Sequence, residues 1–211
     1  MNSRERVQVA LNHQEPDRIP FDLGGTPMSG IHHVAYRNLR HYLGLPEEQI
    51  KISDSIQLLA AVSDDMKDRL QVDIHNIAPR SSAAYNLGYE IIGDYSTYVD
   101  EWGIGWRSPV DGGLYYDMYS WPLAPYDTIE EIKQNYKWPD PTDPNRFVGL
   151  RAAALKTIEQ GRAVVIGSIS AGVSEMHAWT RGFEKYFTDF YLYPEVAEYI
   201  MDTVVDLKIA F

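Results

Sequence analysis

The chain has 211 residues, of which 45% are hydrophobic and 23% are charged, and its formal net charge is −11. These values are typical of a globular protein with a sizeable core. The acidic balance argues against a nucleic-acid partner, because no basic surplus is present to neutralise phosphates. No apolar run approaches the ~20 residues of a membrane-spanning helix, so we expect no membrane partner. The lack of cysteine excludes disulfides and thiolate metal ligands within this chain.

The first residues predict a helix and then a strand. Asn2 and Glu5 have the spacing of a capping box, which favours a helix start. Residues 18–23 (RIPFDL) alternate apolar and other side chains, which is typical of a strand. Gly24 and Gly25 close that strand and open a loop. The charged start has no apolar signal-peptide core, so the expected location is the cytoplasm.

The middle of the chain changes from helical to strand-like periodicity. Ser53 or Asp54 predicts the start of a second helix that continues to Leu70, and residues 72–78 predict a second strand. A β-rich insertion, rich in Tyr, Trp and Val, is expected over about residues 88–126, with a hairpin turn at residues 111–113.

The last third repeats the order of helix and strand. A helix that ends at Gly161 precedes an apolar strand over residues 163–169, for which we expect burial on both faces. Two helices follow, the second beginning at Pro194. Strands alternating with helices predict an α/β fold of parallel βα units. We expect a (β/α)₈ TIM-barrel type that is incomplete, with three core βα units plus the hairpin, so that the chain is the N-terminal portion of a longer protein.

Candidate site residues lie where loops follow the predicted strands, because binding and catalytic groups collect there in barrels. His177 and His75 are the catalytic candidates, since imidazole titrates near pH 7. The substrate-binding candidates are Asp22, Gly24, Gly25, His32, Arg80, Ser168 and Ser170.

Structural roles for the same residues stay open. His75 could be a hydrogen-bonded core histidine, and His177 could be a solvent-facing helix residue paired with Arg181. Asp22 could form a turn within its own loop, and Arg80 could form a surface ion pair. No metal site is expected within this chain.

Four segments resemble the uroporphyrinogen decarboxylase-like superfamily. They are SRERVQVALNHQEPDRIPFDLGG, DEWGIGWRSPVDGGLYYDMYSWPL, WPDPTDPNRFVGL and WTRGFEKYF. The resemblance covers nearly the whole chain and implies one (β/α)₈ barrel domain over residues 1–211, with the β-rich insertion inside it. The family includes uroporphyrinogen decarboxylases and zinc-dependent methyltransferases that pass methyl groups to or from corrinoid proteins.

Three positions depart from the decarboxylase pattern. The loop after the first strand contains no arginine before Arg37, where decarboxylases carry two that grip substrate carboxylates. Arg80, or Pro79, stands where they have an aspartate, and Ala178 stands where they have a tyrosine. We therefore expect a methyltransferase in corrinoid-dependent one-carbon transfer. The alternatives are a uroporphyrinogen decarboxylase or related carboxy-lyase, and a non-catalytic protein that binds a tetrapyrrole or corrinoid.

The resemblance also implies the partners. Zinc would be held by a His-x-Cys pair and a later Cys in a C-terminal half outside this chain. The corrinoid would sit on a partner protein, and the substrate would be a small molecule or a tetrapyrrole. Members of the family are often dimers, so a homodimer is one expected assembly.

Overall fold

Two parallel strands that are far apart in the sequence lie at the centre of the first of two compact units. The computed structural model describes residues 1–211. The first unit comprises Met1–Pro79 and Val148–Gly167, and the second comprises Arg80–Phe147 and Ser168–Phe211. The helices are α1 (Ser3–Leu11), α2 (His33–Tyr42), α3 (Asp64–Leu70), α4 (Ile129–Asn135), α5 (Leu150–Glu159), α6 (Val173–Arg181), α7 (Phe183–Leu192) and α8 (Pro194–Ala210), with short 3-10 helices η1 (Pro27–Ser29) and η2 (Pro144–Phe147). The strands are β1 (Ile52–Asp54), β2 (Leu59–Ala60), β3 (Ile74–Ile77), β4 (Glu90–Ile92), β5 (Tyr95–Val99), β6 (Gly105–Pro109), β7 (Asp117–Ser120) and β8 (Ala163–Ile166).

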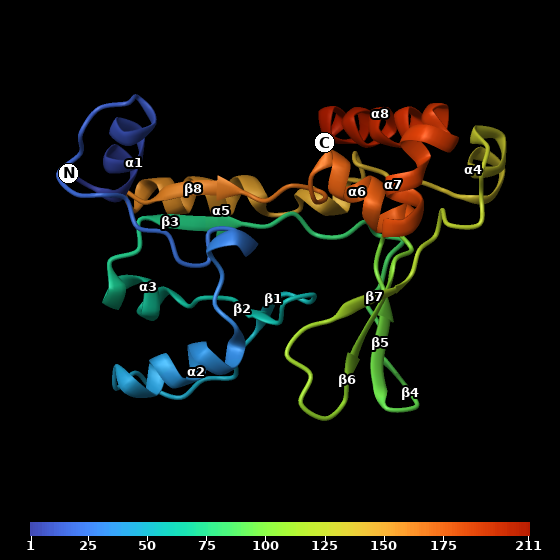
Figure 1. Ribbon diagram of the computed structural model, residues 1–211. Helices are drawn as coiled ribbons and strands as arrows, with labels where there is room; N and C mark the ends of the chain where they lie inside the picture. The colour runs from blue at the N-terminus through green and yellow to red at the C-terminus, as the bar shows by residue number, and fades with distance from the viewer. The chain divides into compact units, whose positions relative to one another are not determined.

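In the first unit β3 pairs with β8 in parallel, with Ile74 opposite Ala163 and Ile77 opposite Ile166. Figure 1 shows the two strands side by side, and α5 packs against both. Two of the predicted strands are therefore parallel, as expected for βα units. The predicted burial of residues 163–169 on both faces is wrong at the end of β8, because the Ile166 side chain is 57% exposed.

The strand predicted over residues 18–23 is wrong. This segment is irregular, although the Asp73 N–H donates to the Phe21 carbonyl at 2.8 Å. Pro20 has no N–H to give to a ladder. The Phe21 N–H donates to the Asp73 carboxylate at 2.9 Å, where a neighbouring strand would have offered a carbonyl. The Asp73 side chain thus takes the place of the backbone carbonyl of a neighbouring strand.

The helix predicted from residue 53 to Leu70 is also wrong in its first half. β1 and β2 form a short antiparallel hairpin there, and only α3 is helical. Asp54 accepts a hydrogen bond from the Gln57 N–H at 2.7 Å, and Leu58 adopts a left-handed conformation with φ 53°. An aspartate that bonds to the backbone two or three residues on favours a turn over a helix.

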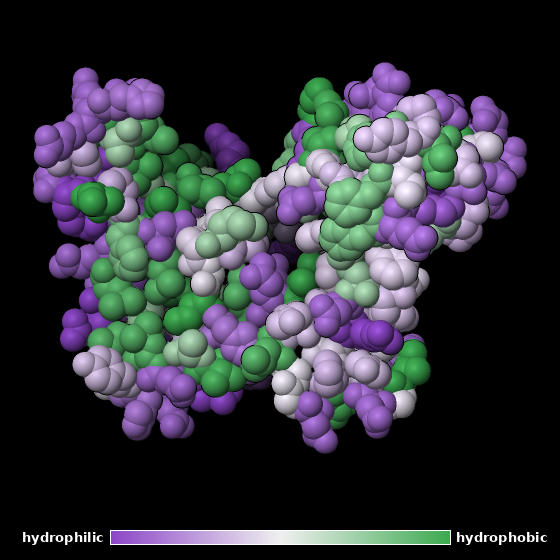
Figure 2. Space-filling view, viewed as in Figure 1, coloured by the Kyte–Doolittle hydropathy of each residue, from purple (hydrophilic) through white to green (hydrophobic).

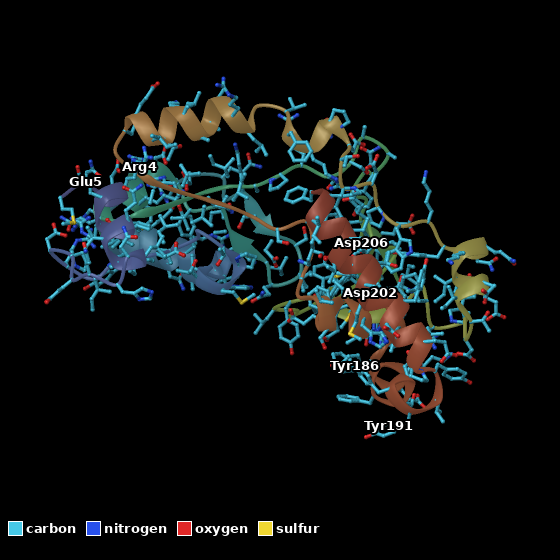
Figure 3. All side chains as sticks on the ribbon, turned by 90° about the horizontal axis from the view of Figure 1, so that it is seen from above. Arg4, Glu5, Tyr186, Tyr191, Asp202 and Asp206 are labelled. Atoms are coloured by element: carbon cyan, nitrogen blue, oxygen red, sulfur yellow. The ribbon has the colours of Figure 1, made fainter.

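The second unit contains a four-stranded antiparallel sheet in the order β4-β5-β6-β7, which lies in the β-rich segment predicted at about 88–126. The helices α6, α7 and α8 pack on one another, and α4 packs on α8. Leu123, Ile132, Val196 and Ile200 form a buried core between them. On α8, Asp202 and Asp206 are exposed, and Figure 3 labels both on that helix.

The strands form three separate sheets, of two, two and four strands, and none is closed into a barrel. The mixed α/β class is therefore confirmed, and the (β/α)₈ barrel stays a prediction. Figure 2 shows hydrophobic residues at the surface of both units on the face viewed. On α7, Phe187 and Tyr191 are 65% and 88% exposed. None of the helices combines the length and apolar character that crossing a bilayer requires.

Candidate functional site

The glycine loop of the first unit is a tight turn packed against β3. Asp22 Oδ1 accepts a hydrogen bond from the Gly25 N–H at 2.9 Å. A Cβ atom added at Gly25 would overlap Asp22 Oδ1 and lie 2.6 Å from Ile74 Cγ2. A Cβ at Gly24 would lie 2.7 Å from Val62 Cγ2. The turn-forming alternative for Asp22 is confirmed, and both glycines are needed for close packing.

His32 lies at the start of α2. Its Nδ1 accepts a hydrogen bond from the Val34 N–H at 3.3 Å, so the side chain caps the helix. Its backbone forms an isolated antiparallel bridge with Leu59. The rings of His32 and His33 lie 4.6 Å apart. These contacts fix the orientation of His32 beside the hairpin formed by β1 and β2.

His75 lies in β3 and is only 6% exposed. Its Nδ1 is 3.5 Å from Arg162 Nη1 and 3.9 Å from Asp64 Oδ1. Burial, reinforced by the charges of Lys67 and Arg162, lowers the pKa of His75 from 6.5 to about 4. The imidazole is therefore neutral at pH 7. One ring nitrogen can donate a hydrogen bond and the other can accept one, but the ring carries no charge.

Arg162 is a neighbour of His75 that the sequence patterns missed. It stands just before β8, and the pairing of β3 with β8 brings it to His75. Its guanidinium donates to Asp64 at 3.3 Å and to Asp68 at 2.6 Å. Only the register of β3 and β8 brings Arg162 to His75, and no spacing along the sequence indicates this contact.

In the second unit, the loop after β8 forms a polar cluster with a lysine from α8. Lys208 Nζ donates to Ser168 Oγ at 3.0 Å and to the Ser170 carbonyl at 3.3 Å. The Ser170 N–H lies 3.4 Å from Ser168 Oγ. Burial lowers the pKa of Lys208. The structure thus joins two predicted substrate-binding serines to a cation that sequence reasoning missed.

His177 is completely buried between α6 and α7. Its Nε2 lies 3.1 Å from Asp189 Oδ2, and Arg181 Nε donates to the same oxygen at 2.7 Å. The rings of Tyr186 and Phe190 pack edge-on against the imidazole. Burial lowers the pKa of His177, although Asp189 opposes the shift. The solvent-facing alternative for His177 is therefore wrong, because α7 covers the face that carries it.

Arg80 is exposed just after β3, and only its backbone is held in place. Its N–H donates to the Arg146 carbonyl at 3.1 Å, and its own carbonyl accepts from Arg146 Nη1 at 3.4 Å. Arg146 in turn forms an ion pair with Glu101. The Arg80 side chain makes no hydrogen bond or ion pair within the chain, so its guanidinium is accessible to an anionic group.

The candidates therefore gather in separate groups. Asp22 and the two glycines share one turn, His75 joins Arg162, Ser168 and Ser170 join Lys208, and His177 joins Asp189. No three His, Asp or Glu side chains converge in a way that could hold a metal ion. The zinc that the family resemblance implies would be held by ligands outside this chain.

The comparisons with known proteins add nothing to the family resemblance, which depends on the four sequence segments. No family model, no curated protein and no solved structure matches this chain.

Proposed function

We propose that this chain is part of a (β/α)₈ enzyme of the uroporphyrinogen decarboxylase-like superfamily, and that its activity is methyl transfer in a corrinoid-dependent one-carbon pathway. The four segments described above support the family. The parallel pair β3 and β8, with α5 packed on both strands, is the arrangement that a barrel of parallel βα units requires.

One observation carries the proposal of a substrate site. Lys208, a partly buried lysine, reaches the serine loop that directly follows β8 and lies 3.0 Å from Ser168 Oγ. Loops at the carboxyl ends of strands are where barrel enzymes bind their substrates. An ammonium beside the Ser168 hydroxyl favours a carboxylate or another anionic group of a small molecule.

The roles of the other candidates follow from their surroundings. The exposed guanidinium of Arg80 would bind a second anionic group, because arginine matches carboxylate geometry. His75, neutral at pH 7, would orient its neighbours by hydrogen bonding rather than supply charge. A corrinoid protein would be the methyl-transfer partner. No step is assigned to zinc, since no side chains here fit it.

The test is an assay of the purified protein with methylcobalamin and a small thiol that carries a carboxylate. We expect methylated thiol by mass spectrometry, and a loss of at least ten-fold in rate in Lys208→Met. Lys137→Met, an exposed lysine of the same unit, is the matched control and should keep the rate. No methylated thiol above the protein-free rate would overturn the proposal, and formation of coproporphyrinogen from uroporphyrinogen would replace it with the decarboxylase alternative.

A further inference from the structure

A cavity of about 400 Å³ lies in the first unit, at the amino-terminal ends of β3 and β8. Val72, just before β3, and Arg162, just before β8, both line it. The first turn of α1 forms another part of the wall, and Figure 3 labels Arg4 and Glu5 on that helix. Since the strands are parallel, this cavity lies at the opposite end from the loops that follow Ile77 and Ile166. It is therefore distinct from the site proposed above.

The wall of the cavity is cationic in a chain that is acidic as a whole. Arg6, Arg18, Lys67 and Arg162 line it, and Asp68 is the only acid among the lining residues. The net charge of the whole chain is −11. The three arginines form ion pairs with nearby aspartates, so Lys67 is the lining cation without an ion pair.

The three arginines are held rigidly by acids, of which only Asp68 lines the cavity. Arg6 donates to Asp17 and Asp73, and Arg18 donates to both oxygens of Asp73. Arg162 donates to Asp64 and Asp68. These guanidinium groups are oriented before any ligand arrives, and most of their N–H donors are already used. They form a rigid part of the wall rather than flexible contacts.

Lys67 is the exception among the four cations. Its side chain is half-buried and makes no hydrogen bond or ion pair within the chain, so three N–H donors remain available. Burial lowers the pKa of Lys67, although the charges of Asp64 and Asp22 oppose the shift. The cavity lies within the usual volume range of small-molecule sites, about 300–1,000 Å³.

We propose that this cavity binds a small, multiply charged anion that carries phosphate or carboxylate groups, with Lys67 making the direct contact. An anion would meet the three free ammonium donors of Lys67. Its charge would also balance that of Lys67, the lining cation without an ion pair.

The test is isothermal titration calorimetry of the purified protein with pyrophosphate and, separately, with citrate. We expect saturable binding of at least one probe, with one site per chain and an affinity that falls as sodium chloride is added. The probe that binds more tightly identifies phosphate or carboxylate as the preferred group.

The variant Lys67→Met should weaken binding at least ten-fold, whereas Lys67→Arg should retain part of it. Lys156→Met is the matched control, because Lys156 is an exposed lysine on α5 of the same unit and does not line the cavity. Circular dichroism checks that each variant is folded. Binding of neither probe, or equal affinity in the wild type and in Lys67→Met, would overturn the proposal. Methyl-transfer activity plays no part in this measurement, so its failure and that of the proposed function can be told apart.

Discussion

His177 Nε2 lies 3.1 Å from Asp189 Oδ2, and both side chains are completely buried. Arg181 is also buried and donates to both oxygens of the same carboxylate, at 2.7 and 2.9 Å. Asp189 lies on α7 and thus accepts three hydrogen bonds from His177 and Arg181 of α6. These bonds hold α7 against α6. The Asp189 carboxylate is costly to lose, because Arg181 would then stay buried with Asp127, at 3.2 Å, as its remaining acidic partner.

We expect Asp189→Asn to destabilise the protein by about 3–5 kcal/mol, the usual cost of breaking a buried ion pair. The free energy of unfolding is measured by urea denaturation followed by circular dichroism. Asp206→Asn, on the exposed face of α8, is the control and should change it by less than about 0.5 kcal/mol. Equal midpoints for the two variants would show that Asp189 does not stabilise the helix pair.

Acidification should destabilise the protein through its buried histidines. The pKa of His75 falls from 6.5 to about 4 on folding, and that of His177 is also lowered. Below pH 6.5 these two histidines bind protons in the unfolded state but stay neutral in the native state. The free energy of unfolding is therefore highest above pH 6.5 and falls as the pH decreases toward 4, by at most about 1.4 kcal/mol per pH unit for each group.

This slope is measured by urea denaturation at pH 7, 6 and 5. His75→Gln should flatten it, because glutamine does not titrate. The control is His41→Gln, which removes an exposed histidine of α2 and should leave the slope unchanged. A wild-type stability that is constant between pH 7 and 5 would contradict the prediction.

Gly25→Ala should destabilise the first unit by about 1–3 kcal/mol, the usual cost of forcing an extra methyl group into a packed site. The added carbon would lie 2.6 Å from Ile74 Cγ2 and overlap the Asp22 carboxylate. Differential scanning calorimetry should show a lower Tm. At Gly88 nothing lies within 4 Å of an added Cβ, so Gly88→Ala should leave the Tm nearly unchanged. A Gly25→Ala protein with the wild-type Tm would mean that the loop is not packed on β3.

Asp100 organises the turn between β5 and β6. Its Oδ1 accepts from the N–H groups of Trp102 and Ile104, both at 2.9 Å, and its Oδ2 accepts from Trp106 Nε1 at 2.8 Å. Asp100→Ala leaves three donors without partners, and we expect a loss of about 3 kcal/mol. Tryptophan fluorescence during urea denaturation reports the change. Asp202→Ala, on the exposed side of α8, should cost less than about 0.5 kcal/mol, and a similar loss in both variants would contradict a specific role for Asp100.

Sequence patterns predicted the elements that local chemistry determines. The patterns at residues 72–78 and 163–169 predicted the strands β3 and β8, and the alternation of strands and helices predicted parallel βα units. The strand at residues 18–23 failed because Pro20 and the Asp73 carboxylate replace ladder bonds. Asp73 lies far along the chain, so no window around residues 18–23 contains it.

The candidate site was less predictable than the fold, because side chains from distant segments complete it. Lys208 reaches Ser168 from α8, and Arg162 reaches His75 through strand pairing. Periodicity placed His177 on a helix, but its burial depends on α7 packing over it. Spacing along one helix carries no information about the helix that covers it.

The order of the two units along the chain has a consequence during synthesis. β3 cannot pair with β8 until the ribosome has produced all of Arg80–Phe147 and then Val148–Gly167. Until then Met1–Pro79 lacks the strand that completes its sheet, and β3 presents unpaired N–H and C=O groups. Such long-range pairing is slow to form. The nascent first unit is therefore the part of this protein most exposed to aggregation, and the part with most to gain from a chaperone.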